Sequence, residues 1–201
     1  MDPTEVAKDR ILKGLAGEYA DLLSIRQDLQ FVAEAARRYQ HLADGDDPDG
    51  VMRRAFWWSA VVAYRRSFTS GRGHGLIKRT RLMVPEPVVE ALSAASKETH
   101  ERTLRAADQH VAHRVDEKLS QMPISLLFHN DASGAAVPAV AGLAQLGALY
   151  VGPVPKEAGE LAELADHLVR ELEAALDAKR SELLSRASEL LEKRQQKGPV
   201  T

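Results

Sequence analysis

The sequence contains no cysteine, which excludes disulfide bonds and thiolate metal sites and agrees with a reducing compartment. Residues 1–10 contain no basic region followed by an apolar run, so we expect no signal peptide and a cytoplasmic protein. There is also no internal repeat, no phosphate-binding glycine-rich loop and no nucleotide-binding fingerprint. These absences exclude disulfide-stabilised secreted domains and the common nucleotide-binding enzymes.

A long uninterrupted hydrophobic run is missing as well. Residues 134–153 carry no charge, but Pro138, Gly142 and Gly147 interrupt them, and alanine outnumbers leucine. A membrane-spanning helix needs about 20 strongly apolar residues. We therefore expect buried structure here and no association with a membrane.

The bulk composition is that of an ordinary globular protein. Of 201 residues, 44% are hydrophobic and 28% are charged, with a net charge of −2 that favours no particular partner. This length predicts a single domain over residues 1–195, followed by a disordered tail over residues 196–201.

Apolar residues recur at three- and four-residue steps, which predicts helices over residues 4–43, 51–68, 87–120 and 156–194. The second of these is apolar nearly all round between Phe56 and Tyr64, so we expect neighbours on most of its sides. Residues 124–129 predict a strand, residues 130–134 a turn, and residues 137–151 either further strands or a short helix. The predicted fold is mostly α: a helical bundle with long first and last helices and a small β element before the last helix.

The middle of the third predicted helix is unusually rich in titratable side chains. At 100° per residue, Leu104, Ala107, Val111 and Val115 share one stripe. His113, Arg105, Arg102 and Asp116 fall on the roughly opposite face. The helix should therefore direct a polar cluster away from its apolar seam.

The segment Ala107-Asp108-Gln109-His110-Val111-Ala112-His113-Arg114 resembles the motif of HEPN domains, and is closest to their abortive-infection branch. In that branch the third helix carries an arginine, an acidic or amide residue and, a few residues later, Ala-His-Arg. Asp108 and the Ala-His-Arg triplet match. Position 107 is alanine where the motif has arginine, and Arg105 lies two residues upstream. The predicted order of elements is also similar.

The resemblance implies metal-independent RNA cleavage in a toxin or phage-defence system, without a cofactor. His113 would accept or donate a proton, and Arg105 would stabilise charge on the phosphate, with His110 and Asp108 beside them. In the family, two subunits form one site, which implies a homodimer. A toxin would add an antitoxin or another protein as partner.

Two alternatives remain for this helix. His110 and His113 could instead satisfy hydrogen bonds at a helix–helix contact, and the protein would then be a catalytically inactive interaction module. His100, His110, His113 and Asp116 could also ligate a metal, but no matching histidine and carboxylate pair occurs on another helix, and His167 is isolated. We predict no metal site.

A basic segment precedes the motif. Between Val51 and Arg81 there is no acidic residue, and the cations are Arg53, Arg54, Arg65, Arg66, Arg72, Lys78, Arg79 and Arg81. We predict nucleic-acid contacts by the last six of these, because a local cluster of arginine and lysine is typical of RNA-binding surfaces. The alternative is that they pair with the acidic loop 44–50 and the acidic last helix.

The leucines of the last helix leave a similar choice. Leu161, Leu164, Leu168, Leu172 and Leu176 form one stripe, which could be a dimer surface. Packing against the first helix is favoured, because the two helices have similar lengths and can pair antiparallel.

Overall fold

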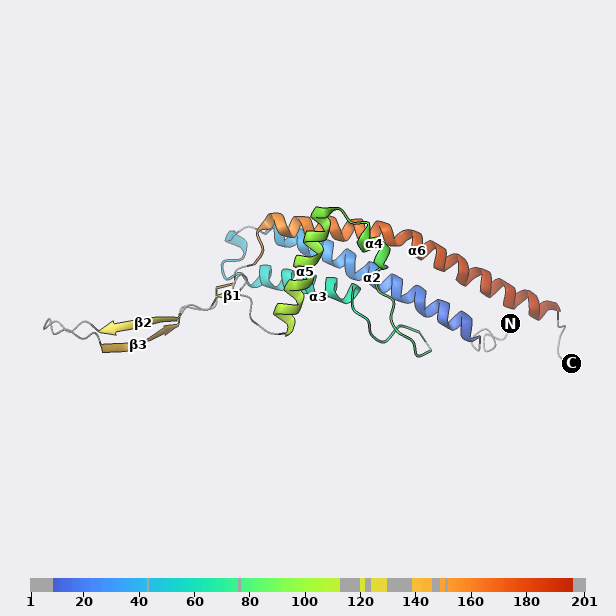
Figure 1. Cartoon of the computed structure of the whole chain (residues 1–201), viewed down its shortest axis with the longest axis horizontal. Coiled ribbons are helices and arrows are strands. Elements are labelled where there is room, and N and C mark those ends of the chain that lie inside the picture. The colour runs from blue at the N-terminus through green and yellow to red at the C-terminus, as the bar shows by residue number, and fades with distance from the viewer. Residues whose placement is uncertain are drawn as a thin grey trace.

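The computed structural model describes residues 9–42, 44–75, 77–112, 120–121, 124–129, 139–145, 149–150 and 152–196. It confirms a mostly α helical bundle with long first and last helices (Figure 1). The elements in chain order are α2 (Arg10–His41), the 3₁₀ turn η1 (Asp44–Asp46), α3 (Val51–Ser67), α4 (Glu86–Glu90), α5 (Ala94–Ala112), β1 (Ser120–Gln121), β2 (Ile124–His129), β3 (Ala139–Gln145), β4 (Leu149–Tyr150) and α6 (Pro155–Gln196).

The frame of the bundle is the antiparallel pair of α2 and α6, which make the most extensive contact between any two elements (Figure 1). The leucine stripe of α6 is buried against α2, as the sequence predicted. Ion pairs border this contact: Asp9 with Arg186, Glu18 with Lys179, Arg26 with Glu173, and Arg37 with Asp166. From one ion pair to the next, the residue number of the α2 partner rises while that of the α6 partner falls, as antiparallel packing requires.

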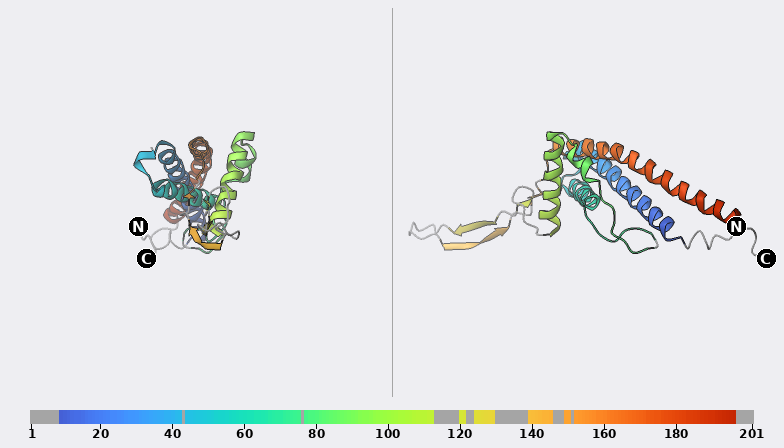
Figure 2. Two further views of the ribbon diagram at one scale, coloured as in Figure 1. Left: turned by 90° about the vertical axis from the view of Figure 1, so that its left-hand side faces the viewer. Right: turned by 45° about the vertical axis from the view of Figure 1, so that its right-hand side comes forward.

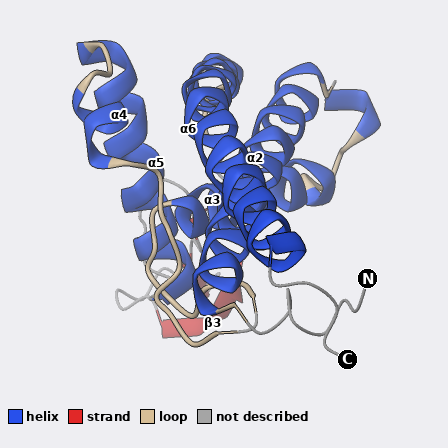
Figure 3. Cartoon of the chain, turned by 90° about the vertical axis from the view of Figure 1, so that its right-hand side faces the viewer, coloured by secondary structure: helices blue, strands red, loops and turns tan. Residues whose placement is uncertain are grey.

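Helix α3 begins after the cluster of turn residues that ends α2. Asp47 caps it by accepting hydrogen bonds from the backbone N–H groups of Met52 at 3.0 Å and Arg53 at 2.9 Å. The helix packs on α2 and α5, but it was wrong to expect neighbours on most of its sides. Trp57 and Tyr64 are buried, whereas Val62 is 39% exposed, because α2 and α5, which pack on α3, leave this face uncovered. Figure 3 views the pair of α2 and α6 nearly end-on.

The third predicted helix is interrupted. The structure has a short α4 and a separate α5, with Ala91–Ser93 between them. Ser93 caps the start of α5, because its hydroxyl accepts a hydrogen bond from the backbone N–H of Ser96 at 3.1 Å. The prediction of helix as far as residue 120 was also wrong, since Ser120–Gln121 form the strand β1.

The small β element lies before α6, as predicted. β2 is the expected strand, and residues 137–151 supply strands rather than a helix: β3 pairs antiparallel with β2, and β4 with β1. The predicted turn 130–134 lies outside the described residues. The β2–β3 ladder stands apart from the helices (Figure 2). None of the described helices is both long enough and apolar enough to cross a membrane.

Candidate functional site

The described residues of the motif, 107–112, lie at the C-terminal end of α5, next to α3. Asp108 is exposed and forms a two-pronged ion pair with Arg65 of α3, with nitrogen–oxygen distances of 2.8 and 3.1 Å. Arg105 is exposed and has no ion pair or hydrogen bond with any described residue. His113 and the side chain of His110 lie outside the described part of the chain, so their predicted roles stay predictions.

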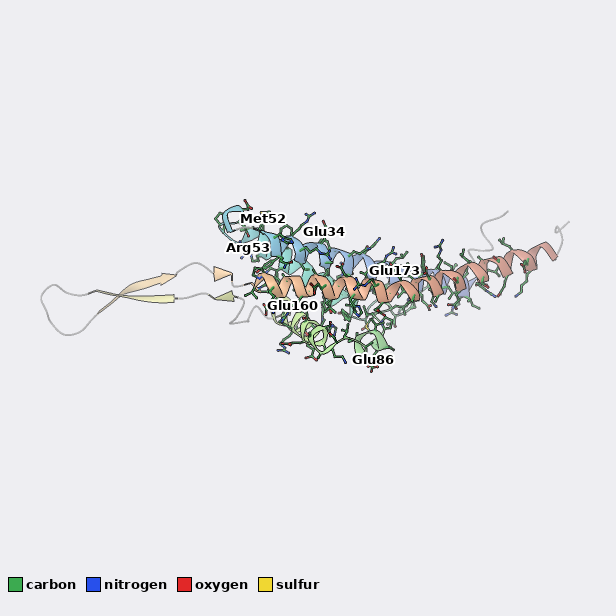
Figure 4. The ribbon with its side chains drawn as sticks, turned by 90° about the horizontal axis from the view of Figure 1, so that it is seen from above. Glu34, Met52, Arg53, Glu86, Glu160 and Glu173 are labelled. Carbon is green, nitrogen blue, oxygen red and sulfur yellow. The ribbon has the colours of Figure 1, made fainter. Side chains whose placement is uncertain are left out.

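The seam of α5 is confirmed as far as Ala107, which is only 2% exposed. The position at which the HEPN motif has arginine therefore belongs to the core of this protein. Arg102, on the opposite face of the helix, is not free. It contacts α6, with Nη2 at 2.8 Å from Glu160 and Nη1 at 3.6 Å from Glu157 (Glu160 is labelled in Figure 4).

Between α3 and α4 the basic segment folds into a hairpin, residues 71–81, which lies beside the N-terminal half of α2 (Figure 1). The N–H of Gly73 donates to the carbonyl of Arg79 at 2.9 Å, and the N–H of Arg81 donates to the carbonyl of Gly71 at 2.8 Å. Arg72 and Thr80 form the pair between these two bonds. Because side chains alternate along an extended chain, successive residues of each arm point to opposite faces of the hairpin.

The inward face of the hairpin is fixed to α2 by buried charge. Arg79, whose side chain is 13% exposed, lies with Nη1 at 2.7 Å from the carboxylate of Asp21, which is 0% exposed. Two turns along α2, Asp28 lies at 3.5 Å from Arg81. Asp21 also accepts the backbone N–H groups of His74 at 2.8 Å and Leu82 at 2.9 Å, and Nδ1 of His74 at 2.6 Å.

Burial alone would raise the pKa of Asp21, but the hydrogen bonds from His74, Leu82 and Arg79 outweigh it, so the pKa lies below its usual value of 3.8. Asp21 is therefore a charged anchor inside the protein. Two glycines allow the close approach that this requires. A Cβ on Gly17 would lie 2.5 Å from the carbonyl oxygen of His74, and Gly75 has a φ of 99° and lies against Gly17.

The outward face of the hairpin carries exposed cations. Arg72 and Lys78 are exposed and pair with no described residue. His74 is half exposed beside them. Arg66 of α3 is 57% exposed, and among the described residues its side chain pairs with the shared carboxylate of Asp28 alone, at 3.5 Å. The hairpin thus covers Asp21 completely and leaves Asp28 only 14% exposed, while its own outward side chains are positive.

The alternative of ion pairing therefore holds for four of these arginines, but with other carboxylates than those of the acidic loop and the last helix. Arg65, Arg66, Arg79 and Arg81 use carboxylates of α2 and α5 rather than the last helix. Sequence reasoning missed Asp21 and Asp28. Their signal was present, since Asp21, Ile25, Asp28 and Val32 follow the same three- and four-residue steps as the buried stripe of α2. A carboxylate in that phase needs a buried cationic partner.

His100, one of the residues weighed as a metal ligand, is part of the core. Its Nδ1 lies 2.8 Å from the hydroxyl of Tyr64, and its ring lies edge-on to Phe68. Burial lowers its pKa below 6.5. His167 lies 4.0 Å from Glu171 on the same helix. Within the described ranges no three histidine or carboxylate side chains gather as metal ligands do.

Comparison with known proteins adds no assignment. No protein-family model, curated protein or solved structure matches this chain. The HEPN resemblance therefore rests on the motif and on the order of the elements.

Proposed function

We propose that this protein binds RNA through the outward face of the hairpin 71–81 and the adjoining end of α3. The observation that carries the proposal is the sorting of charge. Asp21 is buried under the hairpin and Asp28 is only 14% exposed beside it, whereas Arg72, Lys78 and Arg66 are exposed. Phosphate oxygens are contacted mainly by exposed arginine and lysine side chains, and here the ion pairs of Arg79 and Arg81 fix the hairpin that carries them.

RNA is favoured over other polyanions because the HEPN resemblance implies RNA cleavage by residues of the motif helix. Arg65, at the end of α3, pairs with Asp108 of the motif, which connects the basic segment to the motif helix. In the proposed endoribonuclease, His113 transfers the proton and the exposed Arg105 stabilises charge on the phosphate, with His110 beside them. The toxin or phage-defence setting, the homodimer and an antitoxin partner belong to the same proposal.

The binding test reverses charge on the hairpin without disturbing its anchors. The double variant Arg72→Glu, Lys78→Glu should bind a single-stranded oligoribonucleotide more weakly. The slope of log Kd against log salt should fall by about 1.4, since each phosphate contact on a single strand contributes about 0.7. The matched control, Arg54→Glu with Lys97→Glu, reverses two exposed, unpaired cations elsewhere in the described chain and should keep the slope. Equal slopes for both double variants would refute this surface.

The cleavage test is separate. His113→Ala should abolish RNA cleavage, because a general acid or base typically contributes about 10²–10⁴-fold in rate, while RNA binding and the melting temperature are retained. Wild-type protein that binds RNA but does not cleave it would leave the binding proposal standing and remove the catalytic one.

A second function, that of a catalytically inactive interaction module, is supported by one observation. The position of the motif arginine is Ala107, which is 2% exposed, and Asp108 already pairs with Arg65. In this function the motif residues stabilise the contact between α5 and α3 instead of forming a catalytic site. Failure of the wild type to bind RNA, together with a stable dimer in sedimentation, would favour this function.

A further inference from the structure

A groove between α2 and α3 lies next to the proposed RNA surface and has no role in the motif chemistry. It has a volume of about 460 Å³ and is lined by Asp28, Phe31, Trp58, Ser59, Val62, Ala63 and Arg66. On α3, Trp58, Val62 and Arg66 follow one another at four-residue steps, so they form one row along the helix. Phe31 faces them from α2 and is 47% exposed.

The groove and the hairpin surface meet at Arg66. The same carboxylate oxygen of Asp28 lies 3.5 Å from Nε of Arg66 and 3.5 Å from Nη2 of Arg81. Nη1 of Arg81 also donates to the backbone carbonyl of Arg66 at 3.3 Å. A bound chain could therefore run from the hairpin face into the groove without leaving the positive surface.

The lining suits a flat, neutral group attached to an anion. Phe31 and Trp58 provide aromatic surface, Val62 and Ala63 apolar walls, and Arg66 a cation at one end. Asp28 is the one acid of the groove, but it is only 14% exposed and is balanced by two guanidinium groups. Unpaired bases stack on aromatic rings in this way, while their phosphates contact arginine.

We propose that this groove binds an unpaired nucleobase of single-stranded RNA, with the phosphate next to that base on Arg66. The inference rests on the proposed function and specifies it: the hairpin holds the backbone, and the groove selects unpaired bases. A partner helix is a poorer occupant, because it needs apolar anchors over several turns. The apolar part of this lining is confined to Phe31, Trp58, Val62 and Ala63.

The test compares an oligouridylate with an abasic ribose-phosphate strand of the same length. Phe31→Ala should weaken oligouridylate binding roughly 5- to 150-fold, the range for loss of one base–aromatic stack, and leave abasic binding unchanged. The control Ile11→Ala removes an apolar side chain that is 58% exposed on the same helix but outside the groove, and should change neither affinity. Oligouridylate, but not the abasic strand, should quench tryptophan fluorescence, and Trp58→Phe should remove most of that quenching.

The outcomes separate the two proposals. If the wild type binds both strands with equal affinity, or if Phe31→Ala binds oligouridylate normally, the groove does not bind bases and the RNA surface remains. If the wild type binds neither strand, the proposed function is wrong and the groove proposal falls with it.

Discussion

The replacement Asp21→Asn should loosen the hairpin from α2, because it removes the negative charge that binds Arg79 and the backbone N–H groups of His74 and Leu82. The carboxylate is fully buried and accepts hydrogen bonds from His74 and Leu82, with Arg79 at 2.7 Å. Asparagine has nearly the same shape, but its NH2 group, a donor, would replace one of the carboxylate oxygens that accept hydrogen bonds from the hairpin. Arg79 would then remain partly buried without a countercharge.

The magnitude follows from the burial of both partners. Removing one partner of a buried ion pair costs about 3–5 kcal/mol, because the other charge stays uncompensated. Since the side chain of Arg79 keeps 13% of its exposure, some water can reach it, and we expect the lower end of that range, about 3 kcal/mol. In a chain of this size the melting temperature should fall by about 6–12 °C.

Urea unfolding at pH 7 measures this cost, and Asp28→Asn is the matched control on the same helix. Asp28 is 14% exposed, and its arginine partners lie at 3.5 Å, so its removal should cost about 1 kcal/mol. If Asp21→Asn costs no more than Asp28→Asn, Asp21 is not the anchor of the hairpin.

The acid limb of the stability curve gives a second reading of the same change. The folded-state pKa of Asp21 is lowered from 3.8, so its contribution to stability is complete above pH 3.8 and is lost as pH falls through the folded pKa. Asp21→Asn should therefore lose less stability than the wild type below pH 3.8. An unchanged acid limb would contradict the lowered pKa.

Two further predictions concern α5. Ala107→Arg, which restores the residue of the HEPN motif, should destabilise the protein by about 3 kcal/mol or more in a thermal melt, because position 107 is 2% exposed and has no room for a charged side chain; an unchanged melting temperature would contradict the packing of this helix. Burial lowers the pKa of His100, so its contribution to stability is complete above pH 6.5 and declines as pH falls below 6.5 towards the folded pKa. His100→Gln should show a smaller loss in urea midpoint between pH 7.5 and pH 5 than the wild type, and an equal loss would contradict this assignment.

The elements that could be predicted from the sequence are those set by local periodicity. The leucine stripe of α6 and the strand β2 repeat their own pattern within a few residues, and both lie where the sequence placed them. The break between α4 and α5 was missed because Ser93 acts as a cap within a segment whose apolar spacing continues across it. The exposed face of α3 could not be predicted, because it depends on where α2 and α5 pack on this helix, and their contacts are not encoded in its local sequence.

In the candidate site, too, the local features could be predicted from the sequence and the distant contacts could not. The run of cations from Arg53 to Arg81 was visible in the sequence, but their partners lie far away in the chain: His74 bonds to Asp21 across 53 residues. Predicting a hairpin over residues 71–81 would have separated the inward from the outward cations, since alternation puts Arg79 and Arg81 on one face and Lys78 and Thr80 on the other. The number of cations therefore says little about RNA binding here. What distinguishes this surface is that carboxylates of α2 neutralise Arg79 and Arg81 and fix the hairpin. Arg72 and Lys78 are therefore held outward at fixed positions rather than on a free loop, with Arg66 of α3 nearby.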